Sequence, residues 1–510
     1  MRVEQIERFI GGLRPDAPYQ KPFLWPVAFP EVFQHGGFDI VLANPPYVRQ
    51  EKLAAGDQQV YAQAFPEVHT GTADILVYFY ARAIQILRDG GWLSFITSNK
   101  YMRAGYGERI RAHLPQALAL ERVVDFGDLP LFEANGKAVA AYPVVSVGSE
   151  GAASSEHRLG VVDLTYPVRR ALDDAGKRVN PETVREALED MEVLIEATQV
   201  ADYPQVLLKK GGWILEDPAL VRLFERLMSQ GRPLGELVQG RMYYGIKTGL
   251  NEAFVIDAAK RAELIAADPR SSELIKPWLR GRDIKRWRPQ WAGLYVIAVQ
   301  NSGDGDASNP WAKARTEAEA RRTFASTYPL IHDHLSRYEA RLRPRADQGR
   351  FWWELRSCSY YREFERPKVV WPEFARRIRS CYADAGVYLN NKCYFWADAP
   401  TWSLAVLNSE LVEFLLCMIT SQLRGGFLQL YDHFVRRLPL VVPGDAEARG
   451  LVREMNGCDG DSQGERAIEA AVRSLYGLSA EQGSVIDEWF RRRSLAAGTA
   501  EDEGGDEEEG

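Results

Sequence analysis

FDIVLANPPY, residues 38–47, gives the strongest indication of the fold. Its first six residues, 38–43, are mostly apolar and include β-branched side chains, which predicts a buried strand. Asn44, Pro45, Pro46 and Tyr47 follow at once. Each proline fixes φ at about −65° and lacks a backbone donor, so the pair predicts a rigid turn. In open α/β sheets, ligands bind beyond the carboxyl ends of the strands, which is where this turn lies.

The residues that follow alternate between helix and strand patterns. Residues 73–91 have apolar residues at helical spacing and end in Gly-Gly, and residues 92–97 have the pattern of a strand. A further helix is predicted over 104–118, and further strands over 122–127 and 140–148. Such alternation predicts an α/β fold with a parallel sheet.

The turn offers hydrogen-bond acceptors. The side-chain carbonyl of Asn44 and the backbone carbonyl of Pro45 lack a local partner, so together they suit the two hydrogens of an exocyclic amino group. Accepting both hydrogens leaves the nitrogen lone pair free to attack a methyl sulfonium. Tyr47 offers a flat face on which a planar base can stack. The pattern predicts amine methylation, and it suits the amines of adenine, guanine and glutamine equally. A proline-rich surface turn is the alternative.

Composition limits the class of protein. The chain has 510 residues, of which 46% are hydrophobic and 26% charged, so a globular protein of several domains is expected. Five scattered cysteines and the lack of a Cys/His cluster argue against a disulfide scaffold and predict no metal site. The sequence shows neither a membrane-spanning run nor a signal peptide, which predicts a cytoplasmic location.

Charge divides the chain into three blocks. Residues 1–204 carry a net charge of −7, residues 205–445 carry +9, and residues 446–510 carry −9. A basic middle block suits a polyanionic partner, although a solvated basic face is the alternative. Residues 462–493 have the pattern of two helices, and the acidic stretch 494–510 predicts a disordered tail.

Within the basic block, Lys and Arg alternate with aromatic residues, a pattern typical of phosphate and base contacts. Residues 245–249 form a glycine-bounded turn whose spacing does not match a nucleotide-triphosphate loop. A single arginine is as well explained by a solvated surface, whereas the cluster favours DNA. The candidate DNA-binding residues are Arg241, Lys247, Thr248, Arg280, Arg282, Lys285, Arg286, Arg376 and Arg377.

Several segments, in this order, resemble a known family. They include FDIVLANPPY, VVDFGDLPLF (123–132), GIKTGLNEAFVID (245–257) and RPKVVWPEF (366–374). Together they are similar to the adenine-N6 DNA methyltransferases of the type IIG restriction–modification and phage-defence (BREX-like) families, which end in a TaqI-like specificity domain. The resemblance implies an α/β fold in which a partial Rossmann-like class I methyltransferase sheet occupies residues 1–204. An α+β target-recognition domain over 205–445 and C-terminal helices over 446–493 would follow.

The resemblance also implies roles for single residues. Asn44 and Pro45 would bind the N6 amine of an adenine flipped out of double-stranded DNA, and Pro46 would complete the rigid turn. Tyr47 would stack on the base, and Tyr106 would form a second wall of the base pocket. An ordinary half-buried tyrosine explains Tyr106 equally well. Asp74 opens the predicted helix and is expected to cap it rather than to take part in catalysis.

The cofactor implied is S-adenosylmethionine, which the family binds through a glycine-rich strand–turn–helix upstream of the two prolines. Residues 1–43 contain only two Gly-Gly pairs, at 11–12 and 36–37. The chain is therefore expected to be the C-terminal part of a longer or split enzyme, with a separate N-terminal methyltransferase or nuclease subunit as partner. Alone it is expected to bind cofactor poorly. The alternative functions are a catalytically inactive DNA-binding specificity subunit of a defence complex, and methylation of protein glutamine or ribosomal RNA.

Overall fold

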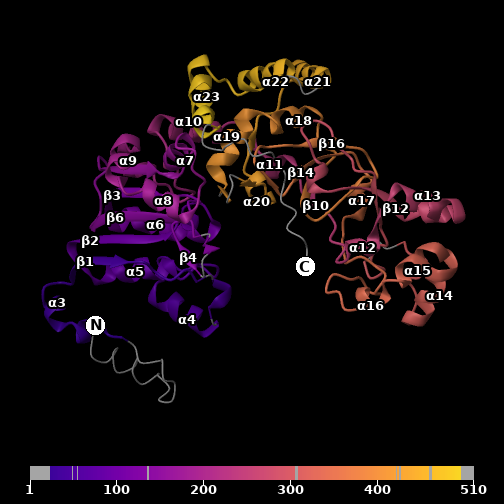
Figure 1. The fold of residues 1–510 in the computed structure, drawn as a ribbon, viewed down its shortest axis with the longest axis horizontal. Coiled ribbons are helices and arrows are strands. Elements are labelled where there is room, and N and C mark those ends of the chain that lie inside the picture. Colours follow the sequence, from indigo (N-terminus) through magenta and orange to yellow (C-terminus); the bar gives the residue numbers. More distant parts are fainter. Residues whose placement is uncertain are drawn as a thin grey trace, which may run out of the picture. The chain divides into compact units, whose positions relative to one another are not determined.

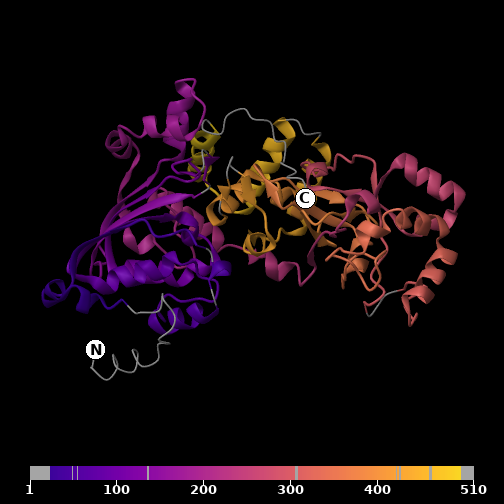
Figure 2. The same cartoon turned by 60° about the horizontal axis from the view of Figure 1, so that its bottom comes forward.

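The structure is a computed structural model. It describes residues 23–48, 50–53, 55–134, 137–139, 141–304, 308–420, 422–423, 427–458 and 462–494. The chain divides into two compact units, Met1–Pro218 (unit 1) and Ala219–Gly510 (unit 2), which are shown as ribbons in Figures 1 and 2 and described separately. The division falls after Pro218, whereas the sequence pattern placed a boundary at residue 204. The glycine pair at 11–12 and the predicted tail beyond Ser494 lie outside the described residues.

Unit 1 is built on a six-stranded mixed sheet. The α/β class is confirmed, but the strand predicted at 140–148 runs antiparallel, since no helix separates it from the strand before it. β1 pairs parallel with β2, and β3 pairs parallel with β7. β6 lies antiparallel between β2 and β3, so β1, β2, β3 and β7 share one direction. In order across the sheet, the strands are β1 (Phe38–Ala43), β2 (Leu87–Ser98), β6 (Pro143–Glu150), β3 (Leu118–Asp125), β7 (Arg158–Asp163) and β8 (Val200–Pro204).

Helices cover the two faces of this sheet over different strands. On one face, α5 (Leu76–Ile86) packs against β2, where the rings of Tyr80 and Phe95 lie 4.9 Å apart. Phe95 is in register with Ser146, and Val124 is in register with Val145, so these two pairs face opposite sides of the sheet. Val124 belongs to the hydrophobic core under three helices, α7 (Thr165–Asp174), α8 (Pro181–Ala187) and α9 (Met191–Thr198). These three helices therefore cover the second face, over β3 and β7.

The helix predicted over 73–91 is shorter in the structure. It begins at Leu76 and ends at Ile86, because residues 87–91 already belong to β2, with Gly90 at a positive φ of 69°. The helices of unit 1 are α2 (Trp25–Ala28), α3 (Pro30–Gln34), α4 (Ala55–Ala64), α5 (Leu76–Ile86), α6 (Glu108–Ala117), α7 (Thr165–Asp174), α8 (Pro181–Ala187) and α9 (Met191–Thr198), and a short hairpin consists of β4 (Glu133–Ala134) and β5 (Lys137–Ala138).

Unit 2 has several small sheets around an aromatic core. Trp311 and Trp353 are buried there, and the ring of Phe324 stacks on Trp353 at 5.5 Å. The strands are β9 (Arg232–Pro233), β10 (Met242–Tyr244), β11 (Val255–Asp257), β12 (Ile275–Leu279), β13 (Leu294–Ile297), β14 (Lys368–Pro372), β15 (Phe374–Ala375), β16 (Cys381–Ala383), β17 (Tyr388–Leu389), β18 (Cys393–Ala397), β19 (Gln422–Leu423), β20 (Phe427–Gln429) and β21 (Pro439–Leu440). Two four-stranded sheets have the orders β10-β18-β14-β16 and β11-β13-β12-β17.

The apolar segment over residues 402–419 forms two helices. Asn408 ends the first, and the Ser409 hydroxyl accepts a hydrogen bond from the Val412 amide to start the second. Among the described residues, no helix combines the length and apolarity that a bilayer crossing requires. The helices of unit 2, apart from 3₁₀ turns, are α10 (Pro218–Met228), α11 (Leu234–Leu237), α12 (Asn251–Phe254), α13 (Ala258–Ala267), α14 (Glu317–Thr327), α15 (Pro329–Ser336), α16 (Glu339–Leu342), α17 (Tyr361–Phe364), α18 (Trp402–Leu407), α19 (Glu410–Ile419), α20 (Asp432–Val435), α21 (Asp445–Gly457), α22 (Ser462–Leu475) and α23 (Ala480–Ser494).

Candidate active site and recognition residues

The Asn-Pro-Pro-Tyr segment leaves the sheet at the carboxyl end of β1, as the sequence predicted. Asn44, Pro46 and Tyr47 are exposed, whereas Pro45 is buried. The Val48 amide donates to the Pro46 carbonyl at 3.0 Å, which closes a tight turn just after the second proline. The arrangement anchors the segment through Pro45 and leaves the Asn44 side chain accessible to a ligand.

Tyr47 is partly covered by one aromatic neighbour. Its side chain is 42% exposed, and its ring lies edge-on to Phe132 with the centroids 6.1 Å apart. Burial raises the pKa of Tyr47 to about 12, so its phenol is neutral at physiological pH. One neutral ring face held by an edge-on neighbour is suited to stacking against a planar group.

Two hydrogen bonds fasten the residues after the turn to the start of α5. The Ile75 amide donates to the Val48 carbonyl at 3.2 Å, and the Gln50 amide donates to the Asp74 carboxylate at 3.2 Å. The prediction that Asp74 caps the helix is wrong, because the N-cap residue of α5 is Ile75 and it makes no side-chain capping bond. The Asp74 side chain instead holds the turn segment against the helix.

Tyr106 lies in a 3₁₀ turn, Gly105–Gly107, and is half-buried. The adjacent Arg111 fixes this turn by donating to the carbonyls of Tyr101 and Ala104 at 2.6 and 2.7 Å. Gly107 is required there, because a Cβ atom would lie 2.0 Å from the Tyr101 carbonyl oxygen. The role of Tyr106 as a wall of a base pocket stays a prediction.

A polar group that the sequence did not predict lies at the carboxyl ends of β2, β3 and β7. The Asn99 amide donates to the Asp125 carboxylate at 2.9 Å, and the Gly127 amide donates to the same carboxylate at 2.9 Å. Burial and the nearby charge of Asp163 raise the pKa of Asp125 to about 6. Asn99 lies two residues after the strand predicted over 92–97, and Asp125 lies within the strand predicted over 122–127. A polar residue near the carboxyl end of each strand was the signal that could have identified them.

Replacing Asp125 with Asn is expected to stabilise the protein at pH 8 and to have little effect at pH 4. Because the pKa of Asp125 is raised in the folded protein, its ionisation lowers the free energy of unfolding above about pH 6. Below about pH 4 the carboxyl is protonated in both the folded and the unfolded chain, so it has little effect there. Asparagine keeps the hydrogen-bond acceptor and removes the charge, so we expect the free energy of unfolding to rise by on the order of 1 kcal/mol at pH 8. Thermal melts of both proteins across this pH range measure it, and a destabilised Asp125→Asn protein at pH 8 would contradict the assignment.

In unit 2, the turn at residues 245–249 is tightly built. Thr248 is buried and donates to the Asn251 side chain at 2.7 Å, and Lys247 forms an ion pair with Asp347 at 2.9 Å. The buried Arg345 donates to the Thr248 carbonyl. In this conformation Thr248 does not reach the surface, so a phosphate contact through its hydroxyl would require the turn to move.

Most of the other predicted DNA-binding cations are engaged within the protein. Arg280 forms two hydrogen bonds with the buried Asp283, at 2.8 and 3.0 Å. Arg241 lies 3.5 Å from the Asp398 carboxylate, and Arg376 lies over the Phe427 ring at 5.0 Å. These intramolecular partners compete with phosphate for the arginines. We therefore expect Arg241, Arg280 and Arg376 to support the fold around the DNA rather than to contact a phosphate directly.

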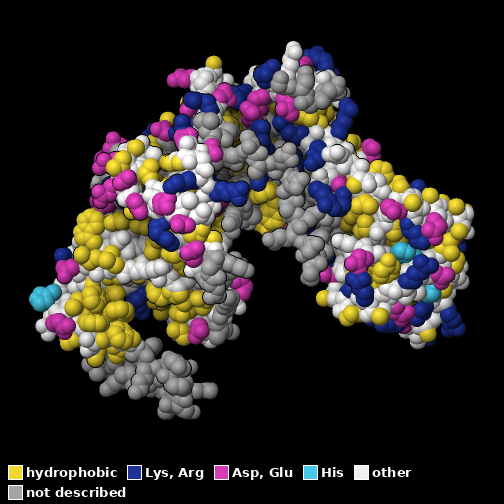
Figure 3. All heavy atoms as spheres, in the orientation of Figure 1, with side chains coloured by type: hydrophobic (Ala, Val, Ile, Leu, Met, Phe, Trp, Pro, Cys, Tyr) yellow, Lys and Arg dark blue, Asp and Glu magenta, His cyan; other side chains and the backbone are white. Residues whose placement is uncertain are grey.

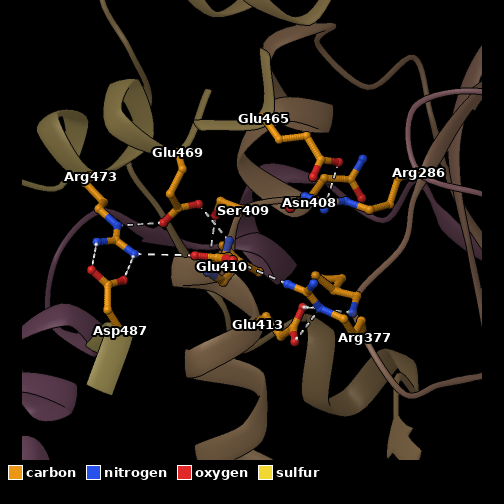
Figure 4. A network of polar contacts seen from close by, with 12 residues as sticks. Arg286, Arg377, Asn408, Ser409, Glu410, Glu413, Glu465, Glu469, Arg473 and Asp487 are labelled. Atoms are coloured by element: carbon orange, nitrogen blue, oxygen red, sulfur yellow. Dashed lines mark hydrogen bonds and ion pairs between the residues drawn. The ribbon is translucent and has the colours of Figure 1, made fainter. Parts of the chain in front are cut away.

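Arg286 and Arg377 belong to the ion-pair network shown in Figure 4. Arg286 pairs with Glu465 of α22 at 2.9 Å, and Arg377 contacts Glu410 and Glu413 of α19 at 3.4 and 3.3 Å. Within the same network, Arg473 lies 2.8 Å from Glu469 and 2.6 Å from Asp487 of α23, and 3.5 Å from Glu410. This network fastens the C-terminal helices to the strands and loops of unit 2.

Arg282 and Lys285 follow β12, and both are exposed, as are the neighbouring Arg288 and the ion-paired Arg377. An exposed cation can reach a phosphate at the surface of the protein.

The double variant Arg282→Ala/Lys285→Ala is expected to weaken DNA binding and to lower its salt dependence. Removing two phosphate contacts reduces the slope of log affinity against log salt by about 2. Fluorescence anisotropy with a random duplex at several salt concentrations measures the slope. The matched control is Lys313→Ala/Arg322→Ala, two exposed cations of the same unit. Equal slopes in both variants would contradict the assignment.

Comparison with known proteins agrees with this geometry. Residues 2–132 match the model of the Eco57I restriction-modification methylase, and residues 276–440 match the model of the TaqI-like C-terminal specificity domain. The type II methyltransferase M.PaeR7I of Pseudomonas aeruginosa is 26% identical over 88% of this chain and 72% of the relative. The type II methyltransferase M.XhoI of Xanthomonas vasicola is 25% identical over 88% of this chain and 76% of the relative.

The fold also resembles a solved structure, that of the type IIL restriction-modification enzyme MmeI in complex with DNA. The TM-score is 0.55 at 12% identity, over 97% of this chain and 63% of that chain. The present chain therefore spans less than two thirds of the solved enzyme. From these matches, the chain combines an Eco57I restriction-modification methylase segment with a TaqI-like C-terminal specificity domain, and its relatives are type II methyltransferases of restriction–modification systems.

Proposed function

We propose that this chain holds the target base and recognises the DNA in a site-specific adenine-N6 DNA methyltransferase of a restriction–modification or phage-defence system. The observation that carries the proposal is the Asn44–Tyr47 turn at the carboxyl end of β1, with Pro45 buried and Asn44 and Tyr47 exposed. The matches to a methylase segment and a specificity domain support the same reading.

In this proposal, the chemistry of the turn is to bind an amino group and orient it. The Asn44 side-chain carbonyl and the Pro45 backbone carbonyl accept the two amino hydrogens of a flipped adenine. Tyr47 stacks on the ring and excludes water from one face of it. The amino nitrogen then keeps its lone pair directed away from the turn, toward the methyl donor.

S-adenosylmethionine is the methyl donor in this proposal. The described residues before β1 form only the short helices α2 and α3, whose Trp25 and Phe29 rings lie 5.7 and 5.4 Å from the Phe38 ring. Their exposed residues include Val27, Pro30 and Glu31, and Gly36 and Gly37 lead from α3 into β1. One glutamate and one Gly-Gly pair do not make the glycine-rich strand–turn–helix that holds a nucleoside. These residues do not fit the cofactor, so we assign its binding to a polypeptide outside the described residues.

The lack of such a cradle among the residues that the structure describes favours a second candidate, a catalytically inactive DNA-binding specificity subunit of a defence complex. The two candidates differ in what happens at Asn44. A methyltransferase needs the Asn44 amide and an open path to it, whereas a pure DNA-binding subunit does not use this side chain.

The class of methyl acceptor tests the proposal. The full chain is mixed with the part of the Pseudomonas aeruginosa relative that lies outside the matched 72%, and incubated with tritiated S-adenosylmethionine and an equal mass of bacterial genomic DNA, ribosomal RNA and total protein. We expect label in DNA, and we expect competition by unlabelled DNA alone to remove it. Label only in RNA or protein would overturn the proposal, and DNA binding without label would favour the inactive subunit.

A further inference from the structure

A strained turn lies in the middle of the basic segment that follows β12. The Arg288 amide donates to the Arg286 carbonyl at 2.9 Å, which closes a γ-turn around Trp287, and the φ of Trp287 is 74°. A γ-turn with this sign of φ is rare and strained, and a positive φ is unusual for a bulky side chain. Such a conformation persists only where its surroundings hold it in place.

On one side, the backbone of unit 2 holds the turn. The Trp287 amide donates to the Ser380 carbonyl at 2.9 Å, and the Tyr382 amide donates to the Trp287 carbonyl at 3.4 Å. The indole of Trp287 is buried. These contacts attach the main chain of the turn to β16 and to the residue just before it, but they do not fix the side chains of the turn.

On the other side, a single carboxylate holds those side chains. The Oε1 atom of Glu465, on α22, accepts a hydrogen bond from the Trp287 indole at 3.4 Å and lies 2.9 Å from the Arg286 guanidinium. Arg286 also donates to the Asn408 carbonyl at 2.5 Å. Figure 4 shows the Arg286 side chain directed toward Glu465 and Asn408. Glu465 therefore draws two successive side chains of the basic segment inward.

Glu465 is itself fixed, because α22 is fastened to its surroundings. Glu465, Glu469 and Arg473 are spaced by four residues, so they lie on one face of α22. Glu469 accepts a hydrogen bond from the Glu410 amide of α19 at 2.7 Å and lies 2.8 Å from Arg473. Figure 3 shows Lys and Arg side chains beside Asp and Glu side chains over the region of α21 and α22. Glu465 is thus a fixed point against which the turn is held.

The turn determines which basic side chains lie at the surface. Lys285 and Arg288 are exposed, whereas Arg286 is half-buried and Trp287 is buried between them. With Arg286 and Trp287 held inward by Glu465, the flanking Lys285 and Arg288 are left outside. Two cations fixed at a surface can contact the phosphates of a duplex with little loss of conformational entropy on binding.

We propose that Glu465 is a positioning residue for DNA binding, which holds Arg286 and Trp287 in the strained turn and thereby presents Lys285 and Arg288 to DNA phosphates. The inference rests on the proposed function, since it requires that unit 2 binds DNA. It predicts an effect of unusual sign. A carboxylate near a DNA-binding surface repels phosphate, so its removal would ordinarily strengthen binding. A positioning role requires that removal weakens it.

DNA binding by the full chain tests this role, measured by fluorescence anisotropy with a random duplex at several salt concentrations. Glu465→Ala is expected to weaken binding about tenfold and to lower the slope of log affinity against log salt by about 1 to 2, because the contacts of Lys285 and Arg288 are lost. In the Lys285→Ala/Arg288→Ala background, Glu465→Ala should have little further effect, since it acts through these two cations.

Two conservative variants separate geometry from charge. Glu465→Gln removes the charge but keeps an oxygen that accepts from Arg286 and Trp287, so it should retain the slope of the unmodified chain. Glu465→Asp keeps the charge but shortens the side chain by one methylene, so it should lower the slope as Glu465→Ala does. The matched control is Glu481→Ala, an exposed glutamate of α23, which should bind DNA like the unmodified chain.

Hydrogen–deuterium exchange without DNA provides a second measurement. We expect the amides of residues 286–288 to exchange about tenfold or more faster in Glu465→Ala, while thermal melts show that every variant is folded. Unchanged exchange in this segment would overturn the proposal. DNA binding that is unchanged or stronger in Glu465→Ala, or as weak in Glu481→Ala, would also overturn it.

The two proposals fail separately. DNA binding that follows these expectations, without methyl transfer to DNA, supports the positioning role and contradicts the proposed function. Methyl transfer to DNA by a Glu465→Ala protein whose DNA affinity and salt dependence are unchanged contradicts the positioning role and leaves the proposed function standing.

Discussion

The variant Asn44→Ala is expected to lose methyl transfer by about 100- to 1,000-fold while its DNA affinity stays unchanged. Asn44 is exposed at the end of β1, and its side chain is an acceptor that the turn itself does not use. Without it the amino group loses one of two hydrogen bonds that align the lone pair. The loss should appear in kcat rather than in the dissociation constant for DNA, because phosphate contacts supply most of the affinity.

The control for this prediction is Asn44→Gln, which keeps the amide and moves it by one methylene. Its rate should lie well below that of the unmodified protein, because alignment of the reacting atoms depends on a displacement of this size. Both variants should melt at the unmodified temperature, since the residue is exposed. An Asn44→Ala rate within about fivefold of the unmodified rate would show that the turn does not position the acceptor.

The variant Tyr47→Ala is expected to lower kcat/KM by about 10- to 100-fold, and Tyr47→Phe by less than about threefold. The prediction follows from the neutral, 42% exposed ring, which lies edge-on to Phe132. Stacking depends on the ring and not on the hydroxyl, so phenylalanine keeps the interaction. Initial rates with the same DNA at several DNA concentrations measure both parameters.

The raised pKa of Tyr47 also predicts how the methylation rates depend on pH. Its pKa is raised to about 12, so the neutral form persists below about pH 11, and the ratio of unmodified to Tyr47→Phe rates should stay constant from pH 7 to pH 9. A Tyr47→Phe variant as slow as Tyr47→Ala, or a ratio that changes in this range, would mean that the hydroxyl takes part in the chemistry.

The strand and turn at residues 38–47 could be predicted from sequence because their signals are local, but the prediction that the strand is buried was wrong, since Ile40 and Leu42 are 59% and 70% exposed. An apolar run determines the strand, and two successive prolines determine the turn, whatever lies elsewhere in the chain. The element types that follow β1 were predicted for the same reason, with an error where residues 87–91 extend β2 instead of α5. The direction of β6 was not predicted, because it depends on a connection that contains no helix.

The partners of charged side chains could not be predicted, because they lie far apart in sequence. Arg286 pairs with Glu465, and Arg377 pairs with Glu410, yet both arginines look like free cations in the sequence. The same holds for Asn99 and Asp125, which meet because parallel strands end at one edge. Sequence composition identified the basic block, whereas only the structure shows that Arg282 and Lys285 are exposed.

The methylated nucleoside itself can be identified. DNA is labelled with tritiated S-adenosylmethionine in the presence of the chain and the part of the Pseudomonas aeruginosa relative outside the matched 72%, then digested to nucleosides and separated. We expect the label to co-migrate with N6-methyldeoxyadenosine and to disappear with Asn44→Ala. Label in a methylated cytosine, or label that survives Asn44→Ala, would contradict the claim that this turn holds the adenine amine.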